Sequence, residues 1–418
     1  MLEIAVACLV ITALLAYVNQ RFVGLPTTIG VMAIAMLLSL GLIGLDRMGF
    51  GALRDYETGL LKSIDFSELL MQGMLSVLLF AGALHIDLQS LRSYRWQVAL
   101  LSVVGTAAST VIVGYAVWWL LPVFGLELPL KFCLVFGALI SPTDPIAVIG
   151  ILKSANAPES VGVVVAGESL FNDGVGVVLF SVLVSIASQS GTPTIGEGFM
   201  LMAREAGGGM LLGGAVGLLL FMLLRSIDNA EVEVLLTLAA VLGGYELASH
   251  LHVSGPLAMV VVGIAIGNHG RELAMSETTR HHVDLFWDLL DQIFNAVLFV
   301  LLGLQIGLIA FTGRVFLASA GVIGVTLLAR ALTVGLPIAG MRGWFRLPRG
   351  SWIVLTWGGL RGGISVALAL SLSPGPRRDL ILALTYAVVV FSVLGQGLSI
   401  RRVVARTLPC AQTSSPSP

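Results

Sequence analysis

Long runs of apolar residues, separated by short polar or glycine- and proline-rich breaks, follow one another along nearly the whole chain. A helix needs about 20 apolar residues to cross about 30 Å of hydrocarbon. About thirteen runs reach or approach that length, and the ninth is the shortest. The pattern therefore predicts an all-α polytopic membrane protein, with spans over 3–19, 24–45, 67–86, 97–121, 130–151, 159–187, 203–224, 231–249, 255–268, 286–309, 314–339, 351–371 and 378–398.

The connections between these runs leave no room for a second folded unit. The longest polar ones, about 46–66 and 269–285, are too short to bury a core of their own. We expect one transmembrane domain over 1–400 and a short cytoplasmic tail over 401–418, disordered in its Ser- and Pro-rich end from Ala411. The first run has no Lys or Arg before it and no cleavage site after it, so we expect it to remain as an anchor.

The positive charges predict an orientation. Loops rich in Lys and Arg stay in the cytoplasm. With the C-terminus inside, the inner loops hold 13 of the 23 Lys and Arg residues and the outer loops hold 8. The sequence favours a multi-pass protein of the inner (plasma) membrane, with the N-terminus outside and the C-terminus in the cytoplasm.

Three glycines in the seventh run are spaced four apart, at Gly209, Gly213 and Gly217. Small residues in this pattern let two membrane helices approach closely. We interpret them as a packing face, with a dimer contact as the alternative.

The composition excludes several classes of protein. Of the 418 residues 57% are hydrophobic and 11% are charged, against about 25% charged in ordinary soluble domains. A soluble enzyme is therefore excluded, and the lipid bilayer is the expected environment. The 23 Lys and Arg residues against 24 Asp and Glu leave no basic surplus for a nucleic-acid partner. Three cysteines match neither a disulfide framework nor a zinc site, so we expect no cofactor.

Five charged residues lie near the middle of predicted spans. A charge at that depth costs about 2.5–3.5 kcal/mol on insertion scales and needs a partner or a function. Two further acids, Glu246 and Asp291, lie at intermediate depth, and we assign them no role beyond packing or gating. The five central residues are Asp144, Glu168, Asp173, Arg330 and Arg361.

Two of the predicted spans should be broken helices. The fifth contains Ser-Pro-Thr-Asp-Pro at 141–145, where two prolines remove backbone donors and clash with the preceding turn. The twelfth contains Gly-Gly-Leu-Arg-Gly-Gly at 358–363, a poor helix sequence around a charge. Unwound carbonyls at mid-depth are ready ligands for a small cation, and one interrupted span in each half is typical of a transporter with inverted repeats.

The sixth span carries four polar residues that can face one cavity. Ser169 and Asp173 are four residues apart and share one stripe of a helix, while Glu168 and Asn172 share the adjacent stripe. Two carboxylates, a hydroxyl and an amide offer hard oxygen ligands, which suit an alkali cation better than a soft metal.

The balance of central charges predicts an exchange reaction. Three acids and two arginines leave one net negative charge at mid-membrane. One proton or one monovalent cation neutralises it, and burial without an ion pair favours the protonated form of a carboxyl group. A site that must be neutral to cross, and that takes one ligand or the other, exchanges them one for one.

Together these motifs carry a family resemblance. Ser-Pro-Thr-Asp-Pro at 141–145, Gly-Glu-Ser-Leu-Phe-Asn-Asp-Gly at 167–174, Ala-Arg-Ala-Leu at 329–332 and Gly-Gly-Leu-Arg-Gly-Gly at 358–363 resemble NhaP-type Na⁺/H⁺ antiporters. These belong to the monovalent cation–proton antiporter family 1, which includes the animal sodium–proton exchangers. The resemblance covers the chain up to about residue 400.

The resemblance implies a homodimer in which a six-helix core, containing two crossing broken helices, moves against a dimerisation domain in alternating access. It implies that Asp173 binds the cation or the proton, with Asp144, Thr143 and Ser169 as further Na⁺ ligands and Asn172 beside them. It also implies an ion pair between Glu168 and Arg330. We expect Asp144 and Arg361 to compensate the dipole ends of the broken helices.

The expected function is electroneutral exchange of Na⁺, Li⁺ or K⁺ for H⁺, serving pH and sodium homeostasis. The residues alone do not rank the three cations. A proton-coupled solute carrier and a passive cation channel are the alternatives, although the chain has no Thr-Val-Gly-Tyr-Gly filter. An intramembrane hydrolase is disfavoured because no His-Glu-x-x-His motif is present.

Overall fold

The computed structural model describes residues 2–49, 54, 57–59, 73–155, 157–188, 195–309 and 312–408. Within these ranges every regular element is a helix. The α-helices are α1 (Leu2–Val18), α2 (Thr27–Arg47), α5 (Leu75–Leu84), α6 (Leu88–Ala99), α7 (Thr106–Leu120), α8 (Leu130–Ile140), α9 (Ile146–Ser154), α10 (Glu159–Ser188), α11 (Ile195–Arg225), α12 (Ala230–His250), α13 (Gly255–Ala265), α14 (Arg271–Leu273), α15 (Glu277–Leu304), α16 (Gly313–Arg330), α17 (Leu336–Gly340), α18 (Arg342–Phe345), α19 (Ser351–Trp357), α20 (Gly363–Leu370), α21 (Pro376–Val390) and α22 (Gly397–Thr407).

Short π or 3-10 turns join several of these α-helices into longer ones. The π turns are η1 (Asn19–Val23), η3 (Leu100–Gly105), η5 (Ile266–Gly270), η7 (Ala331–Gly335) and η8 (Phe391–Gln396), and the 3-10 turns are η4 (Leu121–Phe124) and η6 (Gln305–Leu308). As a result α6 to η4 form one helix over Leu88–Phe124, and α21 to α22 form one over Pro376–Thr407.

The predicted all-α membrane fold is confirmed in the described residues. Nine helices there are long and apolar enough to cross a membrane, and α5 and α13–η5 are shorter apolar helices. The two remaining predicted spans are the broken ones, formed by α8 with α9 and by α19 with α20. Each of the thirteen predicted spans therefore overlaps a helix or a pair of half-helices.

Three helices, α6, α11 and α15, begin eight or nine residues before their predicted spans, and a capping side chain explains the start of two of them. The fourth span was predicted from residue 97, but α6 begins after Asp87, whose carboxylate accepts hydrogen bonds from the Gln89 and Ser90 amides. The tenth was predicted from residue 286, but α15 begins after Ser276, whose hydroxyl caps the Thr279 amide. Hydropathy marks the part of a helix that lies in lipid, while a capping side chain fixes where the helix starts.

At the other end of the chain, α22 continues to Thr407 and so crosses the predicted domain boundary at residue 400. The disorder predicted from Ala411 onward falls outside the described residues.

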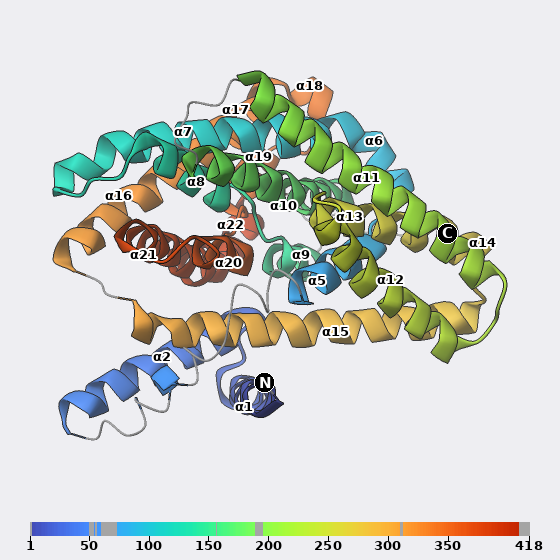
Figure 1. Ribbon diagram of the computed structural model, residues 1–418, viewed down its shortest axis with the longest axis horizontal. Coiled ribbons are helices and arrows are strands. Elements are labelled where there is room, and N and C mark those ends of the chain that lie inside the picture. Colours follow the sequence, from blue (N-terminus) through green and yellow to red (C-terminus); the bar gives the residue numbers. More distant parts are fainter. Residues whose placement is uncertain are drawn as a thin grey trace, which may run out of the picture.

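The helices pack as two groups. One group consists of α6 to α10 and α16 to α22, which share two apolar clusters, and the other contains α1, α2, α5, α11 to α13 and α15. Figure 1 shows α15 running across the molecule, with α1 and α2 on one side of it and most other helices on the opposite side. The first group contains two sets of three spans, each in the order continuous, broken, continuous, which is the arrangement expected of inverted repeats.

The glycine ladder of α11 is a packing face within the chain. A Cβ atom on Gly213 would lie 2.9 Å from Ala258 Cα, and Gly209 and Gly217 also face α13. The neighbouring Gly214 has no atom within 4 Å of its Cβ position among the described residues.

This difference predicts opposite effects for two adjacent substitutions. Gly213→Ala should lower the free energy of unfolding by about 1–3 kcal/mol, because α13 cannot accommodate the methyl group. Gly214→Ala should instead stabilise the helix by about 0.5–1 kcal/mol. Thermal unfolding of both variants in detergent measures this, and equal midpoints would contradict the packing role of Gly213.

Candidate functional site

The site is built where the two broken spans cross. The Asp144 amide donates a hydrogen bond of 2.8 Å to the Leu360 carbonyl, which forms an isolated antiparallel bridge between the unwound segments. Two glycines allow this approach: a Cβ atom on Gly362 would lie 2.7 Å from Asp144 Oδ2, and one on Gly359 would lie 3.0 Å from Arg330 Cζ. The glycines thus allow the two unwound segments to approach each other closely, with the side chains of Asp144 and Arg330 packed directly on the second segment.

Charged side chains lie at two of the half-helix ends. The Arg361 guanidinium donates from Nη1 to the Pro142 carbonyl at 2.9 Å and to the Ser141 carbonyl, both at the C-terminal end of α8. Asp144 packs on Gly362, the residue that precedes α20. A positive group therefore meets the negative end of one helix dipole, and a negative group meets the positive end of the other.

Two side chains of the π turn η8 form hydrogen bonds with backbone groups that the break in the second span leaves without helical partners. The Arg361 amide donates to Ser392 Oγ at 2.8 Å, and Gln396 Nε2 donates to the Trp357 carbonyl at 2.9 Å. Ser392 and Gln396 are themselves joined by a 2.9 Å hydrogen bond. Backbone that would be costly to expose in lipid is thus satisfied inside the protein.

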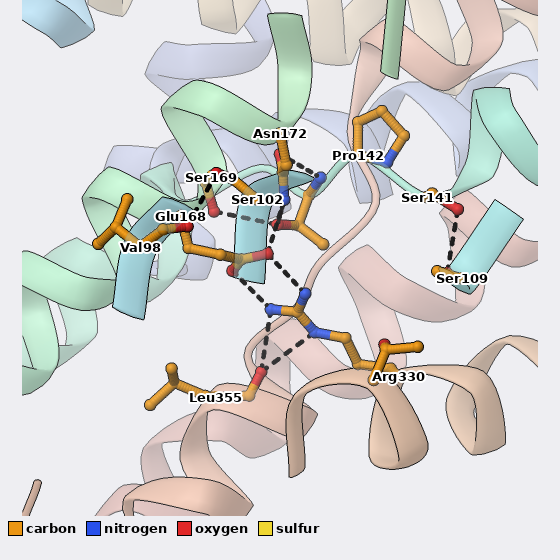
Figure 2. A network of polar contacts seen from close by, with 12 residues as sticks. Val98, Ser102, Ser109, Ser141, Pro142, Glu168, Ser169, Asn172, Arg330 and Leu355 are labelled. Carbon is orange, nitrogen blue, oxygen red and sulfur yellow. Dashed lines mark hydrogen bonds and ion pairs between the residues drawn. The ribbon is translucent and has the colours of Figure 1, made fainter. Parts of the chain in front are cut away.

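A buried ion pair holds α10 to α16. Arg330 Nη1 and Nη2 donate to Glu168 Oε1 and Oε2 at 2.7 and 2.8 Å, as the resemblance implied. Arg330 also donates to the Leu355 carbonyl, and Asn172 Nδ2 donates to Glu168 Oε1 at 2.8 Å (Figure 2). Glu168 is 1% exposed and Arg330 is 7% exposed. The two charges are matched and saturated with hydrogen bonds, so neither is available to a passing ion.

A second polar network ties α10 to the unwound segment after α8. Asn172 Nδ2 donates to Thr143 Oγ1 at 2.9 Å, and the Thr143 amide donates to Asn172 Oδ1 at 3.3 Å. The hydroxyls of Thr143 and Ser169 are 3.0 Å apart. Asn172 and Ser169 therefore fix the conformation of Thr143.

The carboxylates of Asp144 and Asp173 lie at a cavity of about 270 Å³, which we call the Asp173 cavity. Ser169 and Asn172, which we expected at the ion, are not among its lining residues. The polar residues that line it are Thr143, Asp144, Asp173, His85, Asp291, Asn295 and Ser365.

Asp291 is the residue that sequence reasoning left unassigned. It lies on α15, across the cavity from α10, and Asn295 Nδ2 donates to its Oδ1 at 3.1 Å. The sequence did contain a signal: Asp284, Asp288, Asp291 and Asn295 follow a helical period and form one polar stripe on an otherwise apolar helix. Judging each acid by its depth alone concealed that stripe. His85, at the end of α5, lies 3.1 Å from Asp288 and also lines the cavity.

Comparisons with known proteins identify the family of the chain. Residues 9–406 match the family model described as the sodium/hydrogen exchanger, transmembrane. The chain is 50% identical over 410 residues to the Na⁺/H⁺ antiporter NhaP of Pseudomonas aeruginosa, covering 97% of each protein. It is 35% identical to the Na⁺/H⁺ antiporter NhaH of Halobacillus dabanensis, covering 91% of this chain and 96% of that one.

A solved structure shares the fold. The sodium proton antiporter MjNhaP1 from Methanocaldococcus jannaschii, determined at pH 8, superposes with a TM-score of 0.75. The match covers 95% of this chain and 96% of that one at 19% sequence identity.

The buried ion pair predicts a stability effect that depends on which charge is removed. Arg330→Ala leaves the Glu168 carboxylate buried without its partner and should lower the free energy of unfolding by about 3–5 kcal/mol. The double variant Glu168→Gln with Arg330→Gln removes both charges and should recover most of that loss. Thermal unfolding of purified protein measures both, and a double variant no more stable than Arg330→Ala would contradict this account.

Proposed function

The chain belongs to the sodium/hydrogen exchanger family, and on that premise we propose that it exchanges Na⁺ for H⁺ across the membrane at the Asp173 cavity. Its fold is that of a multi-pass membrane transporter, and the family to which it belongs is one of transporters. The observation that carries the proposal is that Asp173 faces the cavity while the Glu168–Arg330 pair beside it is already neutral.

The proposed cation ligands are oxygen atoms that converge on this cavity. Asp173 and Asp144 supply carboxylates from α10 and from the first unwound segment, and Thr143 lies between them. Hard oxygen donors of this kind suit Na⁺, with Li⁺ and K⁺ as competitors. Ser169 and Asn172 act through Thr143, because their polar groups already bond to it.

The proposed stoichiometry is one Na⁺ for one H⁺. Glu168 neutralises Arg330, and Arg361 lies on the carbonyls at the end of α8 while Asp144 lies beside the start of α20. Asp173 is then the one uncompensated charge of the five. A bound proton or a bound Na⁺ neutralises it equally, so exchange moves no net charge. Loss of the bound ligand leaves a bare carboxylate, which is costly to move through the membrane interior.

Several finer features stay predictions of the resemblance. We propose a homodimer in the plasma membrane, with the N-terminus outside and the C-terminus in the cytoplasm, that works by alternating access in pH and sodium homeostasis. Of the competing functions, a proton-coupled carrier for an organic anion would need a basic pocket. The Asp173 cavity instead gathers three carboxylates.

The central prediction concerns Asp173. Asp173→Asn removes the titrating group with almost no change in volume, so it should abolish Na⁺-driven proton movement while the protein still folds. The measurement is collapse of an imposed pH gradient in proteoliposomes with Na⁺, Li⁺ or K⁺ added, with and without a clamped membrane potential.

Asp379→Asn is the matched control, because Asp379 is exposed in the first turn of α21. The Asp379→Asn variant should exchange Na⁺ for H⁺ at the rate of the unmodified protein. Clamping the membrane potential should not change that exchange rate. Exchange by a well-folded Asp173→Asn protein would contradict the proposal.

A further inference from the structure

A second cavity lies farther along α10 than the Asp173 cavity. Its volume is about 300 Å³, and α10, α11, α12 and the start of α13 line it. We call it the Glu205 cavity after the acid on α11. Its other polar side chains are Ser181, Tyr245, Ser249, His252 and Ser254.

The two cavities lie near opposite ends of the α13–η5 helix. The Glu205 cavity is at the beginning of α13, where the Ser254 amide donates to the Glu205 carbonyl at 3.0 Å. The Asp173 cavity reaches Ile86, whose carbonyl accepts a 3.0 Å hydrogen bond from Asn268 in η5. From Gly255 to Gly270 the α13–η5 helix rises about 24 Å, most of the hydrocarbon thickness. The cavities therefore face opposite sides of the membrane.

One stripe of α10 connects the two cavities. Ala166, Leu170 and Asp173 line the first cavity, and Val177 and Ser181 line the second, at spacings of three or four residues. Asp173 and Val177 are separated by about 6 Å along the helix axis. A relative movement of one helical turn would bring the Asp173 carboxylate to the level of the second cavity.

Beside Asp173, α13 packs tightly on α10. A Cβ atom on Gly174 would lie 2.9 Å from Leu257 Cγ, so the leucine side chain rests directly on the α10 backbone next to Asp173. Leu257 is 6% exposed. An apolar side chain therefore lies against α10 at the residue after Asp173.

Glu205 has the chemistry of a cation receptor on this second side. It is a half-buried carboxylate near the start of the apolar span Met200–Arg225. It makes no ion pair with any described residue. The hydroxyls of Ser181, Tyr245 and Ser249 line the same space and can replace part of a cation's hydration shell.

We propose that the Glu205 cavity is the vestibule through which the cation reaches Asp173 from the membrane side opposite the Asp173 cavity, with Glu205 as the receiving carboxylate. Asp291 has the corresponding role in the Asp173 cavity. This inference rests on the proposed exchange function and names the residues that determine apparent cation affinity on each side.

The proposal predicts effects that depend on the side to which Na⁺ is added. Glu205→Gln should raise the half-saturating Na⁺ concentration several-fold when Na⁺ is supplied on the Glu205 side, and should change it little on the other side. Asp291→Asn should show the reverse. Transport is measured in proteoliposomes of defined orientation, with Na⁺ added to one side at a time.

Glu246→Gln is the control for surface charge on the Glu205 side. Glu246 lies one residue from Tyr245 but is exposed and lies 3.2 Å from His250. The Glu246→Gln variant should leave the half-saturating Na⁺ concentration unchanged on both sides. Equal effects of Glu205→Gln on the two sides, or none on either, would overturn the proposal.

Thiol labelling tests the position of the cavities without requiring transport. Ser181→Cys and Ile149→Cys each place one thiol in a cavity, in a protein with Cys8, Cys133 and Cys410 replaced by Ala. A membrane-impermeant thiol reagent should reach the two cysteines from opposite sides of oriented vesicles, and labelling from the same side would refute the arrangement. If the unmodified protein shows no Na⁺/H⁺ exchange but the labelling is two-sided, the proposed function fails while the two-cavity geometry stands.

Discussion

Backbone that leaves a helix inside a membrane must find its hydrogen bonds within the protein, and this requirement shapes the centre of the molecule. The hydrogen bond from the Asp144 amide to the Leu360 carbonyl joins two chain breaks that would each be unfavourable alone. Arg361 and the Ser392–Gln396 pair satisfy groups around them. The opening that results exposes polar groups at mid-depth without exposing them to lipid, and this makes an ion site possible there.

The same crossing separates the paired charges from the carboxylate that faces the Asp173 cavity. Glu168 and Arg330 satisfy each other and clamp α10 against the second repeat. Asn172 links this pair to Thr143, so the charge pair also determines the conformation of the unwound segment. Asp173 is one residue farther along α10, which turns it by about 100° toward the cavity. A single step in sequence therefore separates Asn172, which is bonded to the structural ion pair, from the carboxylate that faces the cavity.

The sequence predicted the fold because its signals were local and strong. Prolines at 142 and 145 and the glycines around Arg361 mark the breaks directly, and the apolar runs mark the spans. The Glu168–Arg330 pair followed from resemblance, since 162 residues separate its members along the chain. Asp291 was missed because its role depends on α15 lying across the cavity from Asp173, a contact between distant segments. Glu205 stands near one end of the predicted span 203–224 and gave no signal in the sequence, since its cavity forms only when α10, α11 and α12 converge.

The apolar side chains beside Asp173 suggest how the proposed site would exchange ions without letting them leak. Leu257 packs on Gly174, the residue after Asp173, and in the proposed cycle Asp173 moves by about one helical turn between the levels of the two cavities. An apolar contact also discriminates by charge, because moving an ionised carboxylate past it costs about 2.5–3.5 kcal/mol on insertion scales. That penalty corresponds to a rate roughly 70- to 400-fold lower for the empty site than for one neutralised by H⁺ or Na⁺. In the proposed cycle, tight coupling would then require no separate gate, because one uncompensated carboxylate must be neutralised before it passes apolar side chains.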